Sequence, residues 1–267
     1  MPTKLPVMLA HGICPFTRLF HPLTGGDNGP DDRFHYFRLI RSTLMRYGYT
    51  VFHTSVAWAG SVDARARDLR DDIIRLTEGF HRWPRVHIIA HSMGGLDARH
   101  MLLNYRMEDR VASLTSIGTP HLGTSYADWG LRRFDSLMDL SRGFGLSLDG
   151  FRDLTREQCR RFNETAAPYE EKNGVHYRTV AGTQPLERIF LPMRFASRII
   201  QNEEGVNDGL VPRSSAMWKE DYHLATIDAD HLNQIGWWNC GEGRAGVSRK
   251  EFESRIQDFY LRLASGL

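Results

Sequence analysis

The stretch "HIIAHSMGGLDAR" at residues 87–99 decides the expected fold, because it joins two kinds of secondary structure at one serine. Residues 87–91 are largely apolar, as in a buried strand, and the residues from 94 onward have a helical pattern. A strand that reverses at once into a helix holds Ser92 at a sharp, strained turn above the sheet. The strand and the helix nearly touch there, so Ala90 and Gly94 need to be small. We therefore predict a nucleophile elbow of the G-x-S-x-G type, with alanine in place of the first glycine.

The alternation of strand and helix around Ser92 continues along the rest of the chain. Strands are predicted at 5–12, 49–58, 85–92, 111–120, 175–183 and 222–229, and helices at 32–48, 61–80 and 94–105. This order predicts an α/β fold with a mainly parallel sheet that is covered by helices on both faces. A chain of 267 residues fits one domain over residues 1–267. Because ligands bind at the carboxyl ends of parallel strands, the loop at Ser92 is a candidate site.

Composition and charge exclude several classes of function. The formal charge is only +2, and Lys, Arg, Asp and Glu are mixed along the chain. We interpret Arg65, Arg67 and Arg70 as a solvated helix face, so no nucleic-acid partner is expected. No run of about 18 apolar residues is present, which excludes a transmembrane helix. Three cysteines at no metal-like spacing argue against a disulfide framework.

The N-terminal sequence "MPTKLPVMLAHG" leads directly into the first strand and has no apolar signal-peptide region. We therefore expect a protein that stays inside the cell, one that leaves by a route without an N-terminal signal, or a mature form. Reduced cysteines favour the cytoplasm only weakly. The sequence leaves the compartment and the oligomeric state open.

Two backbone N–H groups are expected to face the Ser92 hydroxyl. Met93 is the first residue of the predicted helix, and Ile13 follows His11-Gly12 at the end of the first strand. Together their N–H groups would form an oxyanion hole for a substrate carbonyl oxygen. The alternative is that Ser92 only caps a helix, since serine is a favoured N-cap residue. That alternative does not explain why small residues stand on both sides of it.

Six segments resemble, in the same order, the bacterial true lipases of the α/β-hydrolase superfamily, a group typified by secreted Pseudomonas, Burkholderia and Proteus triacylglycerol lipases. The segments are "PVMLAHGI" (6–13), "AHSMGGLDARH" (90–100), "VASLTSIGTPHLGTSYAD" (111–128), "FNE" (162–164), "NDGLVP" (207–212) and "DHLNQ" (230–234). The resemblance covers most of the chain and implies an α/β-hydrolase fold and the hydrolysis of carboxylic esters.

The resemblance also implies a catalytic triad of Ser92 as nucleophile, Asp208 as orienting acid and His231 as general base. The chain order Ser, Asp, His is the one that this superfamily uses. Asp230 is a rival acid, but neighbouring side chains on an extended segment diverge, so it is badly placed to orient His231. Asp228 would point the same way as Asp230 on a continuing strand. Other histidines near the predicted site are His11, His87, His91 and His121.

The segment at about 124–172 interrupts the alternation of strands and helices and is rich in large apolar residues. Those expected to form an apolar helical face are Trp129, Phe134, Leu137, Met138, Phe144, Leu146, Leu148, Phe151 and Leu154. We predict a helical lid over Ser92, whose apolar face lines an acyl pocket and makes transient contact with a lipid surface. The alternative is a set of ordinary helices packed on the sheet.

We expect no cofactor and no metal in the chemistry. Many lipases of the resembled group hold a structural calcium ion through an aspartate shortly after the catalytic histidine, where this chain has Asn233 and Gln234. Glu187 lies in the region of the other calcium ligand. These departures make calcium dependence doubtful, and Asp230 and Gln234 are expected to make hydrogen bonds within the loop.

The leading function is that of a serine hydrolase acting on lipid esters, of the triacylglycerol lipase type, through an acyl-enzyme. An apolar acyl site suits long chains, because burial is worth about 0.8 kcal/mol per methylene. The alternatives are an esterase for short soluble esters, a phospholipid acyl hydrolase and, on the same scaffold, an acyltransferase.

Overall fold

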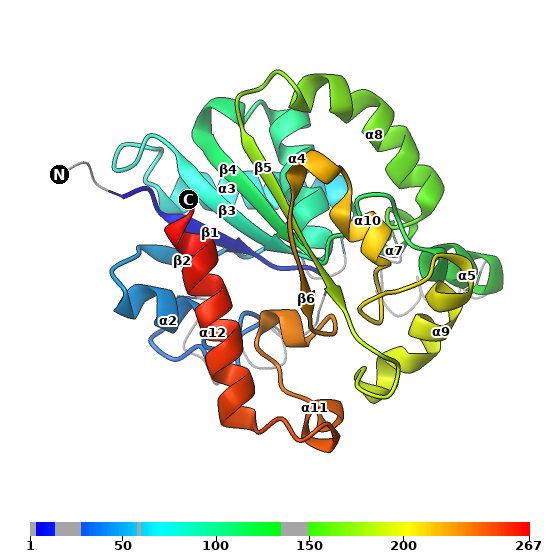
Figure 1. The fold of residues 1–267 in the computed structure, drawn as a ribbon. Coiled ribbons are helices and arrows are strands. Elements are labelled where there is room, and N and C mark those ends of the chain that lie inside the picture. The colour runs from blue at the N-terminus through cyan, green and yellow to red at the C-terminus, as the bar shows by residue number, and fades with distance from the viewer. Residues whose placement is uncertain (1–3, 14–27, 58–59, 135–148) are drawn as a thin grey trace.

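A parallel sheet of six strands forms the centre of the computed structural model, which describes residues 4–13, 28–57, 60–134 and 149–267 (Figure 1). The strand order is β2-β1-β3-β4-β5-β6, and every neighbouring pair is parallel. The strands are β1 (Val7–Ala10), β2 (Val51–His53), β3 (Val86–His91), β4 (Val111–Ile117), β5 (His176–Thr183) and β6 (His223–Asp228). The predicted α/β fold is confirmed.

Helices cover both faces of the sheet, because alternate residues of each strand point to opposite sides. Val7 and Leu9 of β1 join a core that includes residues of α2 (Ile40–Arg46) and α12 (Arg249–Ser265). Met8 and Ala10 join a second core with residues of α3 (Val62–Leu76) and α4 (Met93–Tyr105). Figure 1 shows α12 crossing in front of the sheet and α4 behind it.

The remaining helices follow β4 and β5 or lie near the C-terminus. They are α5 (Ser125–Phe134), α7 (Asp149–Arg152), α8 (Arg156–Glu170), α9 (Arg194–Glu203), α10 (Arg213–Met217) and α11 (Cys240–Arg244), with short 3-10 turns at Glu108–Arg110, Leu191–Met193, Glu220–Tyr222 and Asn233–Ile235. Within the described residues, no helix combines the length and the apolar character that a membrane span requires.

The predicted helix at 32–48 is wrong in its first half, since α2 begins only at Ile40. Leu39 has a left-handed backbone with φ 59°, which no continuous right-handed helix can contain. Residues before it form turns, in which the Asp32 carbonyl accepts hydrogen bonds from the N–H groups of His35 and Leu39. The Asp32 carboxylate then accepts the N–H of Ser42 at 2.8 Å and so satisfies a donor in the first turn of α2.

The insertion at 124–172 is helical where the structure describes it, and its parts pack differently. α8 packs against α4, where the Tyr169 hydroxyl donates to the Leu102 carbonyl at 2.7 Å and Arg99 pairs with Glu170 at 2.6 Å. The alternative of an ordinary packed helix therefore describes α8. The side chains of Phe134, Leu137, Met138, Phe144, Leu146 and Leu148 from the predicted apolar face lie outside the described part of the chain.

Candidate active site

Ser92 stands between β3 and α4 in a strained backbone conformation, with φ 57° and ψ −135°. A non-glycine residue stays in such a conformation only when its surroundings hold it there. Its N–H donates to the Ile117 carbonyl at 3.0 Å, and the Thr119 hydroxyl donates to its carbonyl at 2.7 Å. The end of β4 and the loop after it therefore fix the turn.

Two glycines after Ser92 allow α4 to start against its neighbours. A Cβ atom on Gly94 would lie 2.6 Å from the Ala10 carbonyl oxygen, closer than real Cβ atoms come. A Cβ atom on Gly95 would overlap the side chain of Thr119. The elbow pattern predicts a small residue at position 94. It does not predict one at position 95, where glycine is required because Thr119, in the loop after β4, lies against it.

Ser92, His231 and Asp208 form one hydrogen-bonded chain, although they lie far apart in the sequence. His231 Nε2 is 2.9 Å from Ser92 Oγ, and His231 Nδ1 is 2.8 Å from Asp208 Oδ2. Ser92 follows β3, Asp208 lies between α9 and α10 in the connection from β5 to β6, and His231 follows β6. The three residues named from the resemblance are thus brought together at the carboxyl edge of the sheet.

The Asp208 carboxylate is buried, and each of its oxygens accepts two hydrogen bonds. Oδ1 accepts the N–H groups of Leu210 at 3.0 Å and Val211 at 2.8 Å. Oδ2 accepts the Gln234 side-chain amide at 2.7 Å in addition to the His231 ring. This arrangement compensates the loss of water around the charge and fixes the plane of the carboxylate. Gln234 therefore bonds to the candidate acid itself, beyond the loop contacts expected of it.

The rival carboxylates point elsewhere. Asp230 accepts the N–H groups of Asn233 at 2.8 Å and Phe190 at 2.9 Å. Asp228 is paired with Arg188 at 2.8 Å. Neither carboxylate has a hydrogen bond to an imidazole among the described contacts, so the geometry favours Asp208.

The other histidines near the site have structural partners. His91 lies with its ring centroid 4.5 Å from that of His231, and the Tyr36 hydroxyl is 2.7 Å from its Nδ1. Burial, and then the charge of a protonated His231, lowers the pKa of His91, so its ring is neutral at pH 7. His121 lies between Arg99 and the Ser116 hydroxyl and is likewise held neutral by burial, which lowers its pKa. No pattern in the sequence points to the contact of Tyr36 with His91.

The interpretation of Arg65 as part of a solvated face is wrong. Arg65 is fully buried, and its guanidinium pairs with Asp97 at 2.7 Å. The same guanidinium donates to the His11 carbonyl at 2.8 Å, directly before Gly12. It therefore fixes the end of β1 beside the candidate nucleophile. Its carboxylate partner lies on a different helix, which helical periodicity alone cannot reveal.

The backbone after β1 passes directly beside Ser92. A Cβ atom on Gly12 would lie 2.6 Å from Ser92 Cβ and 3.0 Å from Ser92 Oγ. Ile13 follows Gly12, and Met93 is the first residue of α4, where N–H groups have no acceptor within the helix. The two segments expected to carry the oxyanion hole thus flank the serine side chain.

Part of the insertion rests on these two residues. A Cβ atom on Gly150 of α7 would lie 3.2 Å from Met93 Cε and 3.5 Å from Ile13 Cδ1. Just after α7, the Asp153 carboxylate accepts the N–H of Val62 at the start of α3, at 2.7 Å. α7 therefore covers the segments beside Ser92, and Cys159 of α8 packs in the same apolar cluster as Met93.

Comparison with known proteins places the chain among esterases and lipases. The family described as the alpha/beta hydrolase fold matches residues 44–201. A triacylglycerol lipase 2 of Saccharomyces cerevisiae is 27% identical over 89% of this chain and 82% of that protein. A triacylglycerol lipase of Pseudomonas fragi is 30% identical over 47% of this chain and 38% of that protein. The Staphylococcus hyicus lipase structure has a TM-score of 0.68 at 19% identity, over 99% of this chain and 95% of that one. The resemblance to triacylglycerol lipases is confirmed.

Proposed function

Because the chain belongs to the α/β-hydrolase family, we propose that it cleaves the carboxylic esters of lipids, with Ser92 as nucleophile, His231 as general base and Asp208 as orienting acid. The observation that carries this proposal is the hydrogen-bonded chain from Ser92 Oγ to His231 at 2.9 Å and on to Asp208 at 2.8 Å. An isolated serine hydroxyl is a weak nucleophile, and a neighbouring base is what activates it.

In the first half of the reaction, His231 Nε2 removes the proton from Ser92 Oγ as the oxygen attacks the carbonyl carbon of the ester. The carbonyl oxygen becomes negative and accepts hydrogen bonds from the N–H groups of Met93 and Ile13. The bond to the alcohol oxygen then breaks, and His231 returns its proton to that oxygen. The acyl group remains as an ester of Ser92.

In the second half, a water molecule replaces the alcohol. His231 removes a proton from this water as its oxygen attacks the acyl carbon, and the same N–H groups stabilise the negative oxygen. Collapse of this intermediate releases the carboxylic acid and returns the proton to Ser92. Throughout, Asp208 holds the imidazole in one tautomer and stabilises the imidazolium.

Apolar side chains beside the serine favour a lipid ester over a small polar one. Ile13, Met93, Val62 and Leu96 belong to one apolar cluster, and α7 covers part of it. The relatives named above are lipases, which agrees with a substrate that carries a hydrocarbon chain. Opening of the cover that includes α7 would admit this chain and bring apolar surface to a lipid interface.

A chain-length series of p-nitrophenyl esters, from acetate to palmitate, tests the proposal together with the Ser92→Ala variant. We expect kcat/KM to rise with acyl length, and Ser92→Ala to lose at least about 10³-fold activity while its melting temperature is kept. A fluorophosphonate probe should label the native protein but not the variant. Activity in folded Ser92→Ala that is close to native would refute the triad.

The same assays separate the alternatives. A preference for acetate or butyrate would indicate an esterase for soluble esters, and release of fatty acid from phosphatidylcholine would indicate a phospholipid acyl hydrolase. A new ester formed when an alcohol is added would indicate acyl transfer from the same acyl-enzyme.

A further inference from the structure

Two fully buried carboxylates, those of Asp230 and Glu242, lie in the segment that carries His231 and take no part in the triad. A buried carboxylate costs several kcal/mol unless charged or polar partners satisfy its oxygens. Their partners therefore show what this segment is attached to.

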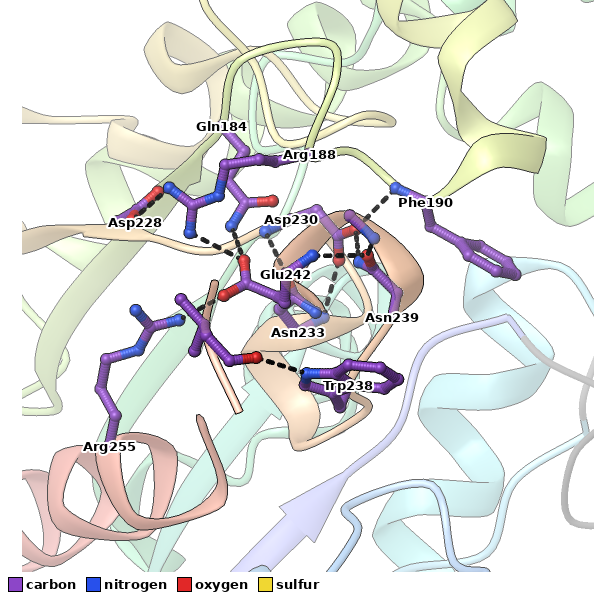
Figure 2. Close-up of polar contacts among 12 residues, drawn as sticks. Gln184, Arg188, Phe190, Asp228, Asp230, Asn233, Trp238, Asn239, Glu242 and Arg255 are labelled. Atoms are coloured by element: carbon purple, nitrogen blue, oxygen red, sulfur yellow. Dashed lines mark hydrogen bonds and ion pairs between the residues drawn. The ribbon is translucent and has the colours of Figure 1, made fainter. Parts of the chain in front are cut away.

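Asp230 ties the His231 loop to two other parts of the chain. Its Oδ1 accepts the N–H of Asn233 at 2.8 Å within the loop. Its Oδ2 accepts the N–H of Phe190 at 2.9 Å and the side-chain amide of Asn239 at 2.6 Å (Figure 2). Phe190 belongs to the segment after β5, and Asn239 is the N-cap of α11. One carboxylate thus connects three segments immediately beside His231.

Glu242 of α11 makes a second set of ties between the same regions. Its Oε1 accepts hydrogen bonds from Arg188, at 2.8 Å, and from the side-chain amide of Gln184. Its Oε2 accepts a hydrogen bond from Arg255 of α12 at 3.2 Å. Arg188 also pairs with Asp228 at the end of β6, as Figure 2 shows. The Arg188 guanidinium is therefore the positive charge between two carboxylates.

The residues in this region do not fit the calcium ion that the resemblance implies. Calcium takes six to eight oxygen ligands. The carboxylate oxygens of Asp230 and Glu242 instead accept hydrogen bonds from N–H groups, and the positive ends of these N–H groups would repel a cation. Asn233, two residues after His231, has its amide oxygen on the Asp230 N–H and its amide nitrogen on the Trp237 carbonyl. Glu187 is exposed at the surface.

The segments are also in direct contact, with no gap for an ion and its ligands at this point. A Cβ atom on Gly241 of α11 would overlap the backbone carbonyl of Arg188. Only glycine fits there, because the backbone of α11 packs directly on the backbone of the segment after β5.

We propose that Asp230, Asn239, Glu242 and Arg188 form a metal-free clamp that positions His231, with the Arg188 guanidinium as the cation that joins the two segments. This inference rests on the proposed role of His231 as the base. The clamp residues do not touch the reacting atoms, and they act by holding the backbone of residues 230–234 so that Nε2 of His231 stays within reach of Ser92 Oγ. A consequence is that the segment that carries His231 needs no calcium ion to hold its position.

The first arm of the test measures metal dependence on the full chain. Ester hydrolysis and thermal melting are recorded after chelation with EDTA and again with calcium chloride. We expect the same kcat, KM and melting temperature in both buffers. A loss of rate or a lower melting temperature in EDTA that calcium restores would overturn the metal-free clamp.

The second arm tests positioning with Asp230→Asn, Arg188→Met and Arg188→Lys. Because a misplacement of about 1 Å can cost about 10²-fold, we expect Asp230→Asn and Arg188→Met to lower kcat about 10- to 100-fold, with KM within about twofold of native. Arg188→Lys keeps the charge and should recover most of the rate. The matched control is Arg160→Met, which removes an exposed ion-paired arginine of α8 and should leave kcat unchanged.

The two proposals fail in different ways. If Ser92→Ala is inactive but Asp230→Asn and Arg188→Met keep native kcat, the clamp is wrong and the triad stands. If a folded Ser92→Ala stays active, the triad is wrong, and melting in EDTA still decides whether the fold holds a metal. A fall in melting temperature with unchanged kcat in the clamp variants would show a purely structural role and overturn the positioning claim.

Discussion

Replacing Gly12 by alanine should disable the site with a single methyl group. The new Cβ would lie 2.6 Å from Ser92 Cβ, whereas carbon atoms in contact are normally about 3.5–4.0 Å apart. The serine side chain and the backbone after β1 must therefore separate by about 1 Å. The Tyr36 hydroxyl, 2.9 Å from the same position, is the end of a long side chain and can move more easily. Ser92 sits in a fixed, strained turn and cannot yield without losing its alignment.

The expected loss follows from that displacement. A shift of about 1 Å costs about 10²-fold in rate, and losing one oxyanion donor costs about 10²–10³-fold, so kcat/KM should fall at least about 100-fold. Overpacking should cost about 1–3 kcal/mol of stability, which thermal melting will show. Gly266→Ala is the matched control, because its Cβ would lie 3.4 Å from Arg178 at ordinary contact distance. A folded Gly12→Ala protein with kcat/KM within threefold of native would refute the described site.

Three further predictions concern buried polar groups. Gln234→Leu removes one hydrogen-bond donor from the Asp208 carboxylate. Because a hydrogen bond to a charged group is worth about 1.5–3 kcal/mol, ester kinetics should show kcat about 10- to 100-fold lower and KM unchanged. Asp97→Ala leaves the Arg65 guanidinium buried without its partner, so urea unfolding should show a free energy of unfolding about 3–5 kcal/mol lower. If Asp97→Ala lowers it equally in a protein that already carries Arg65→Met, the pairing is contradicted. Stability should also fall as the pH drops below about 6.5, because burial lowers the pKa of six histidines, and the unfolded chain then binds protons that the folded chain refuses. Burial raises the pKa of Asp97 and Asp230 to about 6, so below that pH the folded chain takes up protons on these two carboxyls, which offsets part of the loss. Urea unfolding at several pH values tests this, and a flat curve would contradict it. The histidines are His53, His87, His91, His100, His121 and His223.

The parts of the fold that could be predicted are those that local pattern determines. The run before Ser92 is apolar because β3 is buried on both faces, and the small residues after it are needed where the helix touches β1. The start of α2 could not be predicted, because it depends on the left-handed backbone of Leu39 and on turns around Asp32. Phe34 lies in the stretch 32–39, where a helix was expected and turns are found, and its side chain is exposed.

The site itself could be predicted only in part. The elbow follows from residues 90–94 alone, but the assignment of Asp208 over Asp230 came from the resemblance and needs three-dimensional contacts to support it. Arg65 was misread because the partner that justifies its burial lies on α4. The contact between Tyr36 and His91 was not predicted, because the two residues lie in segments far apart in the sequence. The hydrophobic pattern of each segment indicates which of its residues are buried but not which residues of another segment they contact. The roles of the triad and the oxyanion hole stay predictions until the variants are assayed.

The position of His231 in the chain has a consequence for how the protein is made. The serine is synthesised with the first half of the chain, whereas its base follows β6, the last strand to be added and an edge of the sheet. Tyr260 in the final helix then donates to the Gln234 carbonyl at 3.0 Å, which joins the C-terminal residues to the same loop. On the proposed mechanism, a nascent or truncated polypeptide that carries the serine has no means to ionise it. Ester hydrolysis would therefore begin only after β6 and the loop that carries His231 have joined the sheet.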